Sequence, residues 1–385
     1  MLVKLSNYLM IVFIVYGALS CKTTQQATAA GATLDSSIVF LPQEGVYASM
    51  RIPALVISKK GTLLTFCEAR IHNASDWGEM DLVLRRSMDG GKTWGPYQVI
   101  GTRREGGPTG NPAPVVDNNG TIHLLFQRDY ATAYYTRSTD DGNTWSEPTE
   151  ITYAFEKFKT QYNWNVLATG PGHAIQLQNG RLLVPVWLAN SKKLTPHRTH
   201  SPTCIATVYS DDGGNTWQGG VIAADSSADF KNPNENMAVQ LDDGTVMLNV
   251  RTGSTVHRRA VLYSADGISN WSAPVYDTTL FDPVCMASII KVPVSKDGKQ
   301  HVLVFTNPDS RDIPKNPRRN LVAKLSYDQG KSWTVQKVIE PGAAGYSDLT
   351  VGPDGTIYCL YETNRGKDWN YGLMLKKFNL KWLKK

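Results

Sequence analysis

Charged and phenolic side chains occupy matching positions in a hairpin that this 385-residue chain repeats. Counting back nine or ten residues from the turn glycines of five of these hairpins reaches Arg51, Asn111, Pro171, Glu235 and Tyr346. Counting forward seven to nine residues reaches a second set, which includes Arg70, Arg251 and Glu362. Arginines that converge on one place repel one another unless they share an anionic ligand, and paired hydrogen bonds make a carboxylate the best match. The pattern predicts a site for a carboxylate-bearing ligand, although each residue taken alone also has an ordinary structural explanation.

The hairpins themselves are the clearest repeat in the sequence. "RIPALVISKKGTLLTFCEAR" from Arg51 and "GYSDLTVGPDGTIYCLYE" from Gly345 each contain an apolar strand, a polar turn ending in glycine, and a second apolar strand. The six turn glycines are separated by 59, 60, 64, 54 and 57 residues; they are Gly61, Gly120, Gly180, Gly244, Gly298 and Gly355. Only the unit around Gly298 is out of phase, because its turn is longer.

A second motif alternates with the hairpins. It reads "SMDGGKTW" from Ser87 and recurs from Ser138, Ser210 and Ser326, with a degraded copy, "SADGISNW", from Ser264. The aspartate can accept backbone N–H bonds in a tight turn, the glycine supplies a positive φ, and the tryptophan packs on the sheet. Two strands in the hairpin and two beside the motif make units of four strands. Six such units predict an all-β, six-bladed β-propeller of four-stranded antiparallel blades.

A propeller explains how the charged residues would meet. The first strand of every blade lines the central channel, so residues at one phase of the repeat approach each other from distant parts of the chain. A right-handed solenoid is the alternative architecture, but its repeats are normally shorter. Helix is expected only near residues 155–159.

The first residues of the sequence read as export signals. Residues 1–20 have one early lysine and an apolar run from Tyr8 to Leu19, which predicts a signal peptide. Cys21 after small residues predicts a lipoprotein anchored through that cysteine, with ordinary cleavage nearby as the alternative. We expect residues 21–36 to be a flexible tether and residues 37–385 to form the propeller. The expected location is the periplasm or the outer-membrane or cell surface, with full secretion less favoured.

Composition argues against several other classes of function. The formal net charge of +6 is mild and not clustered, which disfavours nucleic-acid binding. The cysteines lack metal-binding spacing, so zinc is not expected. Cys67 and Cys359 sit in apolar strands and are interpreted as core residues, and the sequence fixes no disulfide pairing. No apolar run after the first twenty residues is long enough to span a bilayer.

The combination of motifs resembles the sialidases (neuraminidases) over about residues 37–385. The resemblance is carried by Arg-Ile-Pro at 51–53, the repeated turn motifs, "ATGPGHAIQLQNGRLLVP" from Ala168, "NENMAVQLDDGTVMLNVR" from Asn234 and "GYSDL" from Gly345. It implies the same six-bladed propeller and an active site with three arginines for the substrate carboxylate. These match Arg51, Arg251 and, within "NPRRNLVAKLS", Arg318, with the adjacent Arg319 as the alternative.

The resemblance also implies roles for the remaining residues. Tyr346 matches the nucleophile, Glu235 its base, and Glu362 the glutamate that steadies Arg51. Asp76 matches the acid/base, and its competitor Asp81 is interpreted as structural because it falls in an alternating strand pattern. Arg70 and Asn111 match contacts to the ring substituents, particularly around the 4-hydroxyl. Trp164 and Met286 are more simply core residues than contacts of the glycerol or N-acetyl groups.

A protein of this family would be an exo-α-sialidase that retains configuration through a tyrosyl-enzyme intermediate. Its partners would be sialylated glycans, glycoproteins, gangliosides or sialyl-oligosaccharides, and we expect a monomer that needs no metal or organic cofactor. Two alternatives stay open: a trans-sialidase or intramolecular trans-sialidase, which shares the catalytic residues, and a non-catalytic glycan-binding propeller, which would lack some of them.

Overall fold

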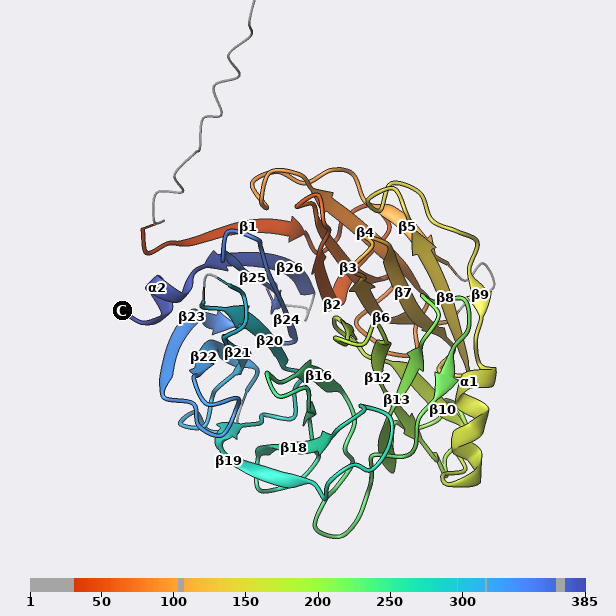
Figure 1. Cartoon of the computed structure of the whole chain (residues 1–385). Coiled ribbons are helices and arrows are strands. Elements are labelled where there is room, and N and C mark those ends of the chain that lie inside the picture. The colour runs from red at the N-terminus through yellow and green to blue at the C-terminus, as the bar shows by residue number, and fades with distance from the viewer. Residues whose placement is uncertain (1–30, 103–106, 296, 316, 365–370) are drawn as a thin grey trace, which may run out of the picture. The chain divides into compact units, whose positions relative to one another are not determined.

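Six antiparallel sheets arranged around a central axis make up almost all of the described structure (Figure 1). This computed structural model describes residues 31–102, 107–295, 297–315, 317–364 and 371–385. The predicted signal peptide, and most of the predicted tether with Cys21, lie outside these residues. Each turn glycine of the repeat sits between the first two strands of one sheet with a positive φ, from 69° at Gly298 to 92° at Gly180. The predicted six-bladed propeller is therefore confirmed.

The blades follow the order of the chain, and blades 1, 2, 4 and 5 each consist of four consecutive strands. Blade 1 is β2 (Ser49–Ile57), β3 (Leu63–Arg70), β4 (Met80–Ser87) and β5 (Gln98–Gly101), and blade 2 is β6 (Thr109–Val116), β7 (Ile122–Arg128), β8 (Thr132–Ser138) and β9 (Thr149–Glu150). Blade 4 is β16 (Asn236–Gln240), β17 (Val246–Val250), β18 (Arg258–Ser264) and β19 (Val275–Phe281), and blade 5 is β20 (Ser288–Pro293), β21 (His301–Pro308), β22 (Arg319–Ser326) and β23 (Val335–Ala343).

Blade 3 has two interrupted edges. Its order is β10 (Val166–Thr169), β12 (Leu182–Ala189), β13 (Thr203–Ser210) and β14 (Gln218–Gly219). The short β11 (Ile175–Gln176) also pairs with β12, and β15 (Ala224–Asp225) also pairs with β13. The predicted local helix is present just before this blade, as α1 (Tyr153–Glu156) and the 3-10 turn η1 (Lys157–Thr160).

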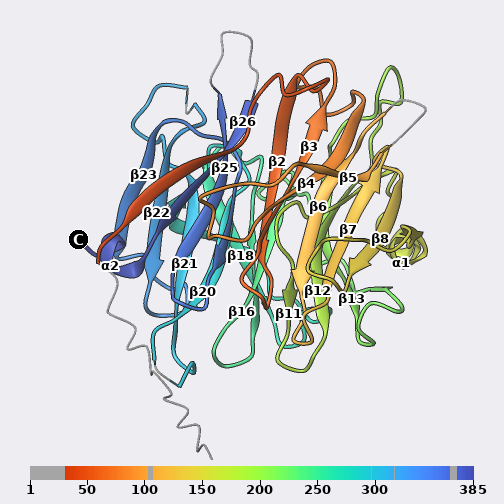
Figure 2. The same ribbon diagram turned by 90° about the horizontal axis from the view of Figure 1, so that it is seen from above.

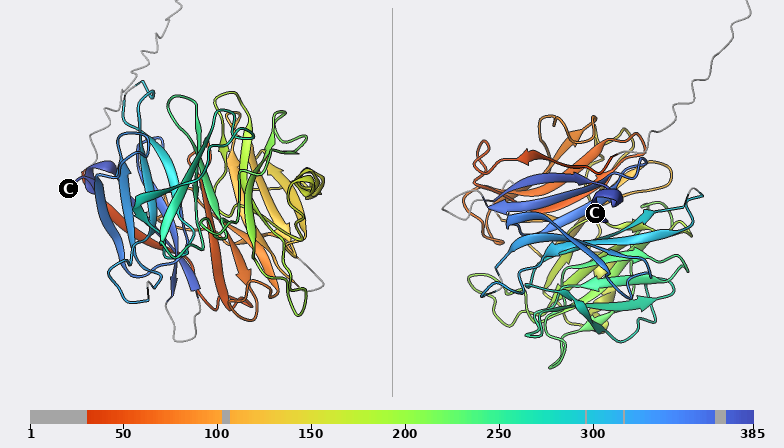
Figure 3. Two further views of the ribbon diagram at one scale, coloured as in Figure 1. Left: turned by 90° about the horizontal axis from the view of Figure 1, so that it is seen from below. Right: turned by 90° about the vertical axis from the view of Figure 1, so that its left-hand side faces the viewer.

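Blade 6 joins the two ends of the described chain. Its inner strands are β24 (Ser347–Val351), β25 (Ile357–Asn364) and β26 (Tyr371–Phe378), and its outer strand is β1 (Leu34–Phe40). β1 pairs antiparallel with β26, from Leu34 opposite Phe378 onward, and so closes the ring (Figure 2). The strand begins three residues before the boundary at residue 37 that the sequence indicates. A last short helix, α2 (Leu380–Leu383), follows β26 and packs on β23 at the outer edge (Figure 3).

The repeated turn motif has the same role in each blade that contains it. In blade 1, Asp89 accepts hydrogen bonds from the backbone N–H groups of Lys92 at 3.0 Å and Thr93 at 2.9 Å, as the sequence predicts. All five copies, including the degraded one, connect the third strand to the fourth. Blade 6 needs no copy because its fourth strand comes from the start of the described chain.

Apolar side chains between neighbouring blades form the core. One cluster joins Leu64 and Phe66 of blade 1 to Leu124 and Phe126 of blade 2, all of them fully buried. Burying one such side chain contributes roughly 1.5–3 kcal/mol, so the contacts between blades hold the ring rigid. The four described cysteines are buried and free, and Cys67 and Cys359 lie in this core as expected. No helix among the described residues is both long and apolar enough to cross a membrane.

A buried carboxylate ties several blades together on the axis. Asp348 of β24 accepts hydrogen bonds from Leu55 N in blade 1 at 2.8 Å and from the Ser288 hydroxyl in blade 5 at 2.8 Å. It also bonds to His173 of blade 3, with its oxygens 2.9 Å from the backbone N and 2.7 Å from Nδ1. Because Asp348 and Tyr346 are two residues apart, this network fixes the strand directly beside Tyr346.

Candidate active site

The phenol of Tyr346 contacts an acidic and a basic side chain from another blade. Its hydroxyl donates to Glu235 Oε1 at 2.5 Å, and Arg251 Nη1 lies 2.6 Å from the phenolic oxygen. Arg251 also pairs with Glu235. Glu235 precedes β16 and Arg251 follows β17 in blade 4, whereas Tyr346 precedes β24 in blade 6. The arrangement places a phenol beside a carboxylate that can take its proton and a guanidinium that can stabilise the resulting phenolate.

The surroundings of this phenol favour its protonated form. Burial raises the pKa of Tyr346 more than any other effect, and the charge of Glu235 raises it further. Arg251 and Arg318 lower the pKa, but the result still lies well above the usual value for tyrosine. Only 5% of Tyr346 is exposed. An isolated phenolate is thus disfavoured here, and the Glu235 carboxylate is placed to accept the phenolic proton.

Three guanidinium groups surround the same ring. The guanidinium carbons of Arg51, Arg251 and Arg318 lie 5.6, 5.9 and 5.0 Å from the centroid of Tyr346. Arg51 comes from β2 of blade 1, and Arg318 directly precedes β22 of blade 5. Residues more than 200 positions apart in the sequence are therefore brought together as the phase of the repeat predicts.

Arg318 differs from the other two arginines in its partner. It donates to the backbone carbonyl of Val284 at 3.0 Å, and within the described part of the chain no carboxylate pairs with it. Arg319, the alternative to Arg318, is exposed and opens β22 without lining the cavity around Tyr346. A half-buried guanidinium without a counter-ion favours an anionic group that enters from solvent.

Glu362 organises the start of two inner strands. Its carboxylate accepts from Arg51 Nε at 3.1 Å and from the backbone N–H groups of Ile52 at 3.0 Å and Tyr346 at 3.2 Å. Burial raises its pKa, but Arg51 and the Ile52 N–H outweigh burial and the pKa of Glu362 falls below its usual value. A side chain at Gly345 would clash with this carboxylate, so glycine is required there. Glu362 therefore fixes Arg51 and Tyr346 with respect to each other.

Asp76 lies at the rim, in the loop between β3 and β4. It is 2.8 Å from Arg70 Nη2 and 3.5 Å from Arg51 Nη1, and 45% of its side chain is exposed. Burial raises the pKa of Asp76, but Arg70 and Arg51 outweigh it and the pKa is lowered. In the unliganded protein Asp76 is therefore a carboxylate. The competitor Asp81 instead accepts hydrogen bonds from Tyr47 at 2.8 Å and Thr102 at 2.5 Å.

Arg70 lies outside the lining of the cavity around Tyr346, whereas Asn111 is part of it. The Arg70 side chain is 1% exposed, is held by Glu68 at 2.5 Å and Asp76, and does not line the cavity. Asn111 does line it, with its backbone N–H donating to Glu68 at 2.9 Å and a φ of 55°. The geometry therefore places Arg70 as the support of Asp76, while Asn111 lines the cavity and its side-chain oxygen accepts from Gln127 at 3.5 Å.

The cavity formed by these residues has a volume of about 290 Å³. Five polar or aromatic lining residues were not identified from the sequence: Tyr130, Trp187, His200, Asn232 and Asn234. Trp187 did carry a signal, because it lies seven residues after Gly180, the interval that also separates Glu362 from Gly355. His200 carried none, since it sits in the long connection between β12 and β13, outside the repeat. Pro171, at the inner position of blade 3, does not line the cavity.

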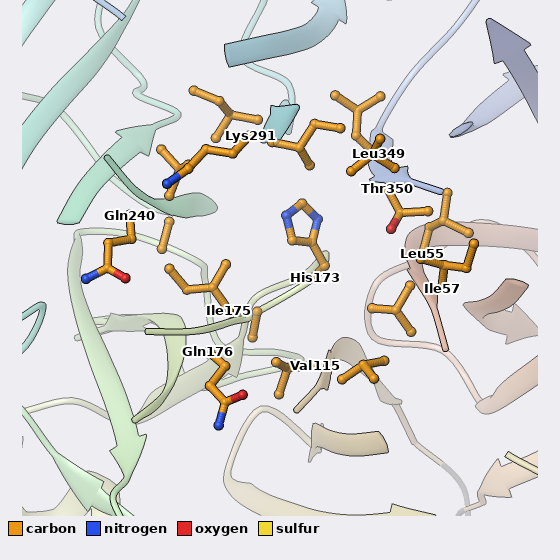
Figure 4. Close-up of a pocket in the computed structure, with 18 of the residues that line it drawn as sticks. Leu55, Ile57, Val115, His173, Ile175, Gln176, Gln240, Lys291, Leu349 and Thr350 are labelled. Atoms are coloured by element: carbon orange, nitrogen blue, oxygen red, sulfur yellow. The ribbon is translucent and has the colours of Figure 1, made fainter. Parts of the chain in front are cut away.

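A larger cavity, of about 480 Å³, occupies the other end of the channel, where the inner strands finish (Figure 4). Its walls are mostly Val, Ile, Leu and Ala side chains around His173. Its one lysine, Lys291, is paired with Asp242 at 3.1 Å. Among the described residues that line it there is no arginine and no tyrosine, so of these two cavities the smaller is the one equipped for an acidic ligand.

Comparison with known proteins agrees with this geometry. The family model described as BNR repeat-like domain matches residues 61–359. The chain is 32% identical over 366 residues to a sialidase of Micromonospora viridifaciens, covering 88% of this chain and 52% of that protein. It is 32% identical over 360 residues to Sialidase-2 of Rattus norvegicus, covering 83% of this chain and 89% of that protein.

A solved structure, the Hadza microbial sialidase Hz136, superposes with a TM-score of 0.75 at 28% identity, covering 90% of this chain and 69% of that one. The chain spans only 52% and 60% of the lengths of the Micromonospora viridifaciens sialidase and of the sialidase from Bacteroides fragilis. The family match and the high coverage of Sialidase-2 nevertheless agree with the cavity: this chain belongs to the sialidase family.

Proposed function

We propose that this protein is an exo-α-sialidase, which removes terminal sialic acid from glycoconjugates with retention of configuration. The observation that carries the proposal is the contact of Tyr346 with Glu235 and Arg251 inside a cavity that three arginines line. Relatives named as sialidases support the same reaction class. The substrates proposed are sialylated glycans, glycoproteins, gangliosides or sialyl-oligosaccharides.

The chemistry of the substrate explains the use of a phenol. Sialic acid carries a carboxylate on its anomeric carbon, and a carboxylate nucleophile would meet that charge at close range. A neutral phenol avoids the repulsion, and sialidases are the exception to the usual pair of catalytic carboxylates. In the proposed complex Arg51, Arg251 and Arg318 bind the substrate carboxylate, which places the anomeric carbon beside the Tyr346 oxygen.

The first step forms a bond between the Tyr346 oxygen and the anomeric carbon. Glu235 takes the phenolic proton, while Asp76 gives a proton to the glycosidic oxygen as its bond to that carbon breaks. In the second step Asp76 removes a proton from water, the water oxygen attacks the anomeric carbon, and the tyrosine oxygen leaves and regains its proton from Glu235. Two displacements at one carbon retain its configuration.

Asp76 must gain a proton before the first step, since the free protein holds it as a carboxylate. The substrate supplies the reason. Its negative charge pairs with Arg51, which otherwise stabilises the Asp76 carboxylate at 3.5 Å, and the bound sugar excludes water from the rim. Both effects raise the pKa of Asp76 and favour the acid form when substrate is present.

The test is hydrolysis of a fluorogenic α-sialoside, followed by NMR of a sialyllactose reaction. Early appearance of the α-anomer of free sialic acid supports retention, and the β-anomer as the first product would contradict the two-step scheme. Transfer of the sugar to added lactose, or an internal ether formed from the glycerol side chain, would identify one of the transglycosylases instead. Absence of any cleavage would refute the proposal.

A further inference from the structure

The loop that carries Asp76 has little regular structure of its own. It connects β3 to β4, and its internal hydrogen bonds include short-range ones such as Ser75 N to Asn73 Oδ1 at 2.8 Å and Trp77 N to Ser75 Oγ at 3.2 Å. A general acid must nevertheless be held within hydrogen-bond reach of the leaving oxygen. The support for this loop has to come from outside it.

Trp77, next to Asp76, packs against aromatic side chains of two other blades. Its ring lies parallel to that of His197, with centroids 5.5 Å apart and an interplanar angle of 3°. The rings of His200 and Tyr130 lie 5.0 and 4.9 Å away, and the Arg198 guanidinium lies 5.5 Å from the Trp77 centroid. Each contact of these kinds contributes modestly, but four on one ring fix its position.

The segment 197–200 that makes most of these contacts is itself anchored. Arg198 donates to the backbone carbonyl of Asn165 at 2.7 Å and also to that of Asp129, which links blades 2 and 3. The backbone N–H of Thr199 donates to Ser191 Oγ at 2.7 Å. The partners of Trp77 are thus attached to the rigid body of the propeller.

We infer that Trp77 is a positioning residue for Asp76: the aromatic contacts from blades 2 and 3 hold Trp77, and Trp77 holds the acid over the cavity. Trp77 does not line the cavity, although Asp76, Tyr130 and His200 do, so its contribution does not require contact with substrate. The inference rests on the proposed function, because it assigns a support to the acid of that reaction.

The leaving group of the substrate distinguishes this role from simple destabilisation. An aryl sialoside releases a phenolate, which needs little protonation. Sialyllactose releases a sugar alkoxide, which needs a proton from Asp76. We expect Trp77→Ala to lower kcat/KM for sialyllactose by about 10–100-fold, the size of effect that a misplaced catalytic group produces. For 4-methylumbelliferyl sialoside the loss should stay below about threefold.

Three further variants make the measurement specific. Trp77→Phe should restore most of the activity on sialyllactose, because a smaller ring still packs against the same partners. His197→Ala removes the exposed stacking partner and should shift the ratio of the two substrates in the same direction by a smaller factor. Trp94→Ala, in the turn motif of the same blade, should affect both substrates equally, since its indole bonds to Ser37 at 3.3 Å, away from the cavity.

The outcomes separate the two proposals. Equal losses of Trp77→Ala on both substrates, or no loss on sialyllactose, would overturn the positioning role while the wild-type protein remains an active sialidase. A wild-type protein that cleaves neither substrate would overturn the proposed function itself. If Trp77→Ala does not fold, the substrate ratio of His197→Ala decides: an unchanged ratio contradicts the inference and a shifted ratio supports it.

Discussion

Removal of the Tyr346 hydroxyl is the most direct test of the proposed chemistry. Tyr346→Phe deletes one oxygen, which is bonded to Glu235 at 2.5 Å and lies 2.6 Å from Arg251. Glu235 and Arg251 remain paired with each other in the variant, so no buried charge loses its only partner. The change therefore isolates the nucleophile from the electrostatics around it.

The expected effects differ greatly in size. A hydrogen bond to a charged group contributes about 1.5–3 kcal/mol, and the remaining ion pair places the loss here near the lower figure. For a chain of this size the melting temperature should then fall by only about 2 °C. The affinity for an unsaturated sialic acid analogue should change by less than about tenfold, or 1.4 kcal/mol, because all three arginines remain. Turnover should fall by about 10⁴-fold or more, the scale seen when a catalytic nucleophile is lost.

The assay is hydrolysis of 4-methylumbelliferyl sialoside, with thermal unfolding and inhibitor titration on the same preparations. Tyr361→Phe is a matched control, since Tyr361 is a fully buried tyrosine of the same blade whose hydroxyl donates to Glu340 at 3.0 Å, outside the cavity. It should lose similar stability but keep normal turnover.

Near-normal turnover of Tyr346→Phe would remove this residue from the mechanism and refute the reasoning. An inhibitor affinity that falls in parallel with turnover would show instead that the hydroxyl matters for binding. Glu235→Gln should resemble Tyr346→Phe in turnover, and the double variant should be little worse than either, because the two groups act as one unit.

Three other predictions concern the charges of the site. Arg251→Lys should weaken the carboxylate-bearing analogue by about 10-fold or more, because lysine lacks the planar fork, and unchanged inhibition would contradict the role of Arg251. Glu362→Gln should destabilise the fold by about 3 kcal/mol, measured by urea unfolding, because the buried Arg51 loses its partner at 3.1 Å and keeps the contact with Asp76 at 3.5 Å. The folded pKa of Glu362 is lowered, so the wild type should also lose stability as pH falls through that pKa, and Glu362→Gln should not. Asp76 must be protonated to act and its pKa in the free protein is lowered, so kcat/KM for sialyllactose should decline as pH rises from the acidic side, and a profile that increases toward alkaline pH would contradict this.

The propeller could be predicted because its signals are local. Each blade contains a turn glycine, and most blades also contain a turn motif. Both signals are recognised from residues close together in the sequence. The closing strand could not be predicted in the same way. β1 has no turn motif beside it, and its partner β26 lies more than 300 residues away. The interrupted inner edge of blade 3 follows no local signal either: at Gly170 to Gly172 the chain contacts the neighbouring blade instead, where Gly172 N donates to Pro112 O at 3.0 Å.

The site was predictable to the extent that it follows the repeat. In five of the six blades, the residue seven positions after the turn glycine lines the cavity or bonds to a residue that does: Glu68, Gln127, Trp187, Arg251 and Glu362. The sequence pattern identified Arg251 and Glu362 in this way but selected Arg70 in blade 1, and the buried Glu68 two residues earlier was overlooked. Trp77 and His200 follow no repeat, because they belong to long connections whose positions depend on packing between blades.

The structure also changes how the arginine cluster is understood. The sequence suggested that the arginines tolerate each other by sharing a ligand, yet most of them have carboxylates of their own. Four guanidinium groups and four carboxylates lie in and beside the cavity, so their formal charges cancel. Glu362 pairs with Arg51, Glu68 with Arg70, and Glu235 with Arg251. Asp76 contacts both Arg70 and Arg51, while Arg318 donates to the Val284 carbonyl. A ligand carboxylate adds one negative charge to this neutral set, and protonation of Asp76 restores the balance. In the proposed mechanism, binding of an acidic sugar and preparation of the catalytic acid are coupled, because a ligand carboxylate paired with Arg51 and Arg318 favours uptake of a proton by Asp76.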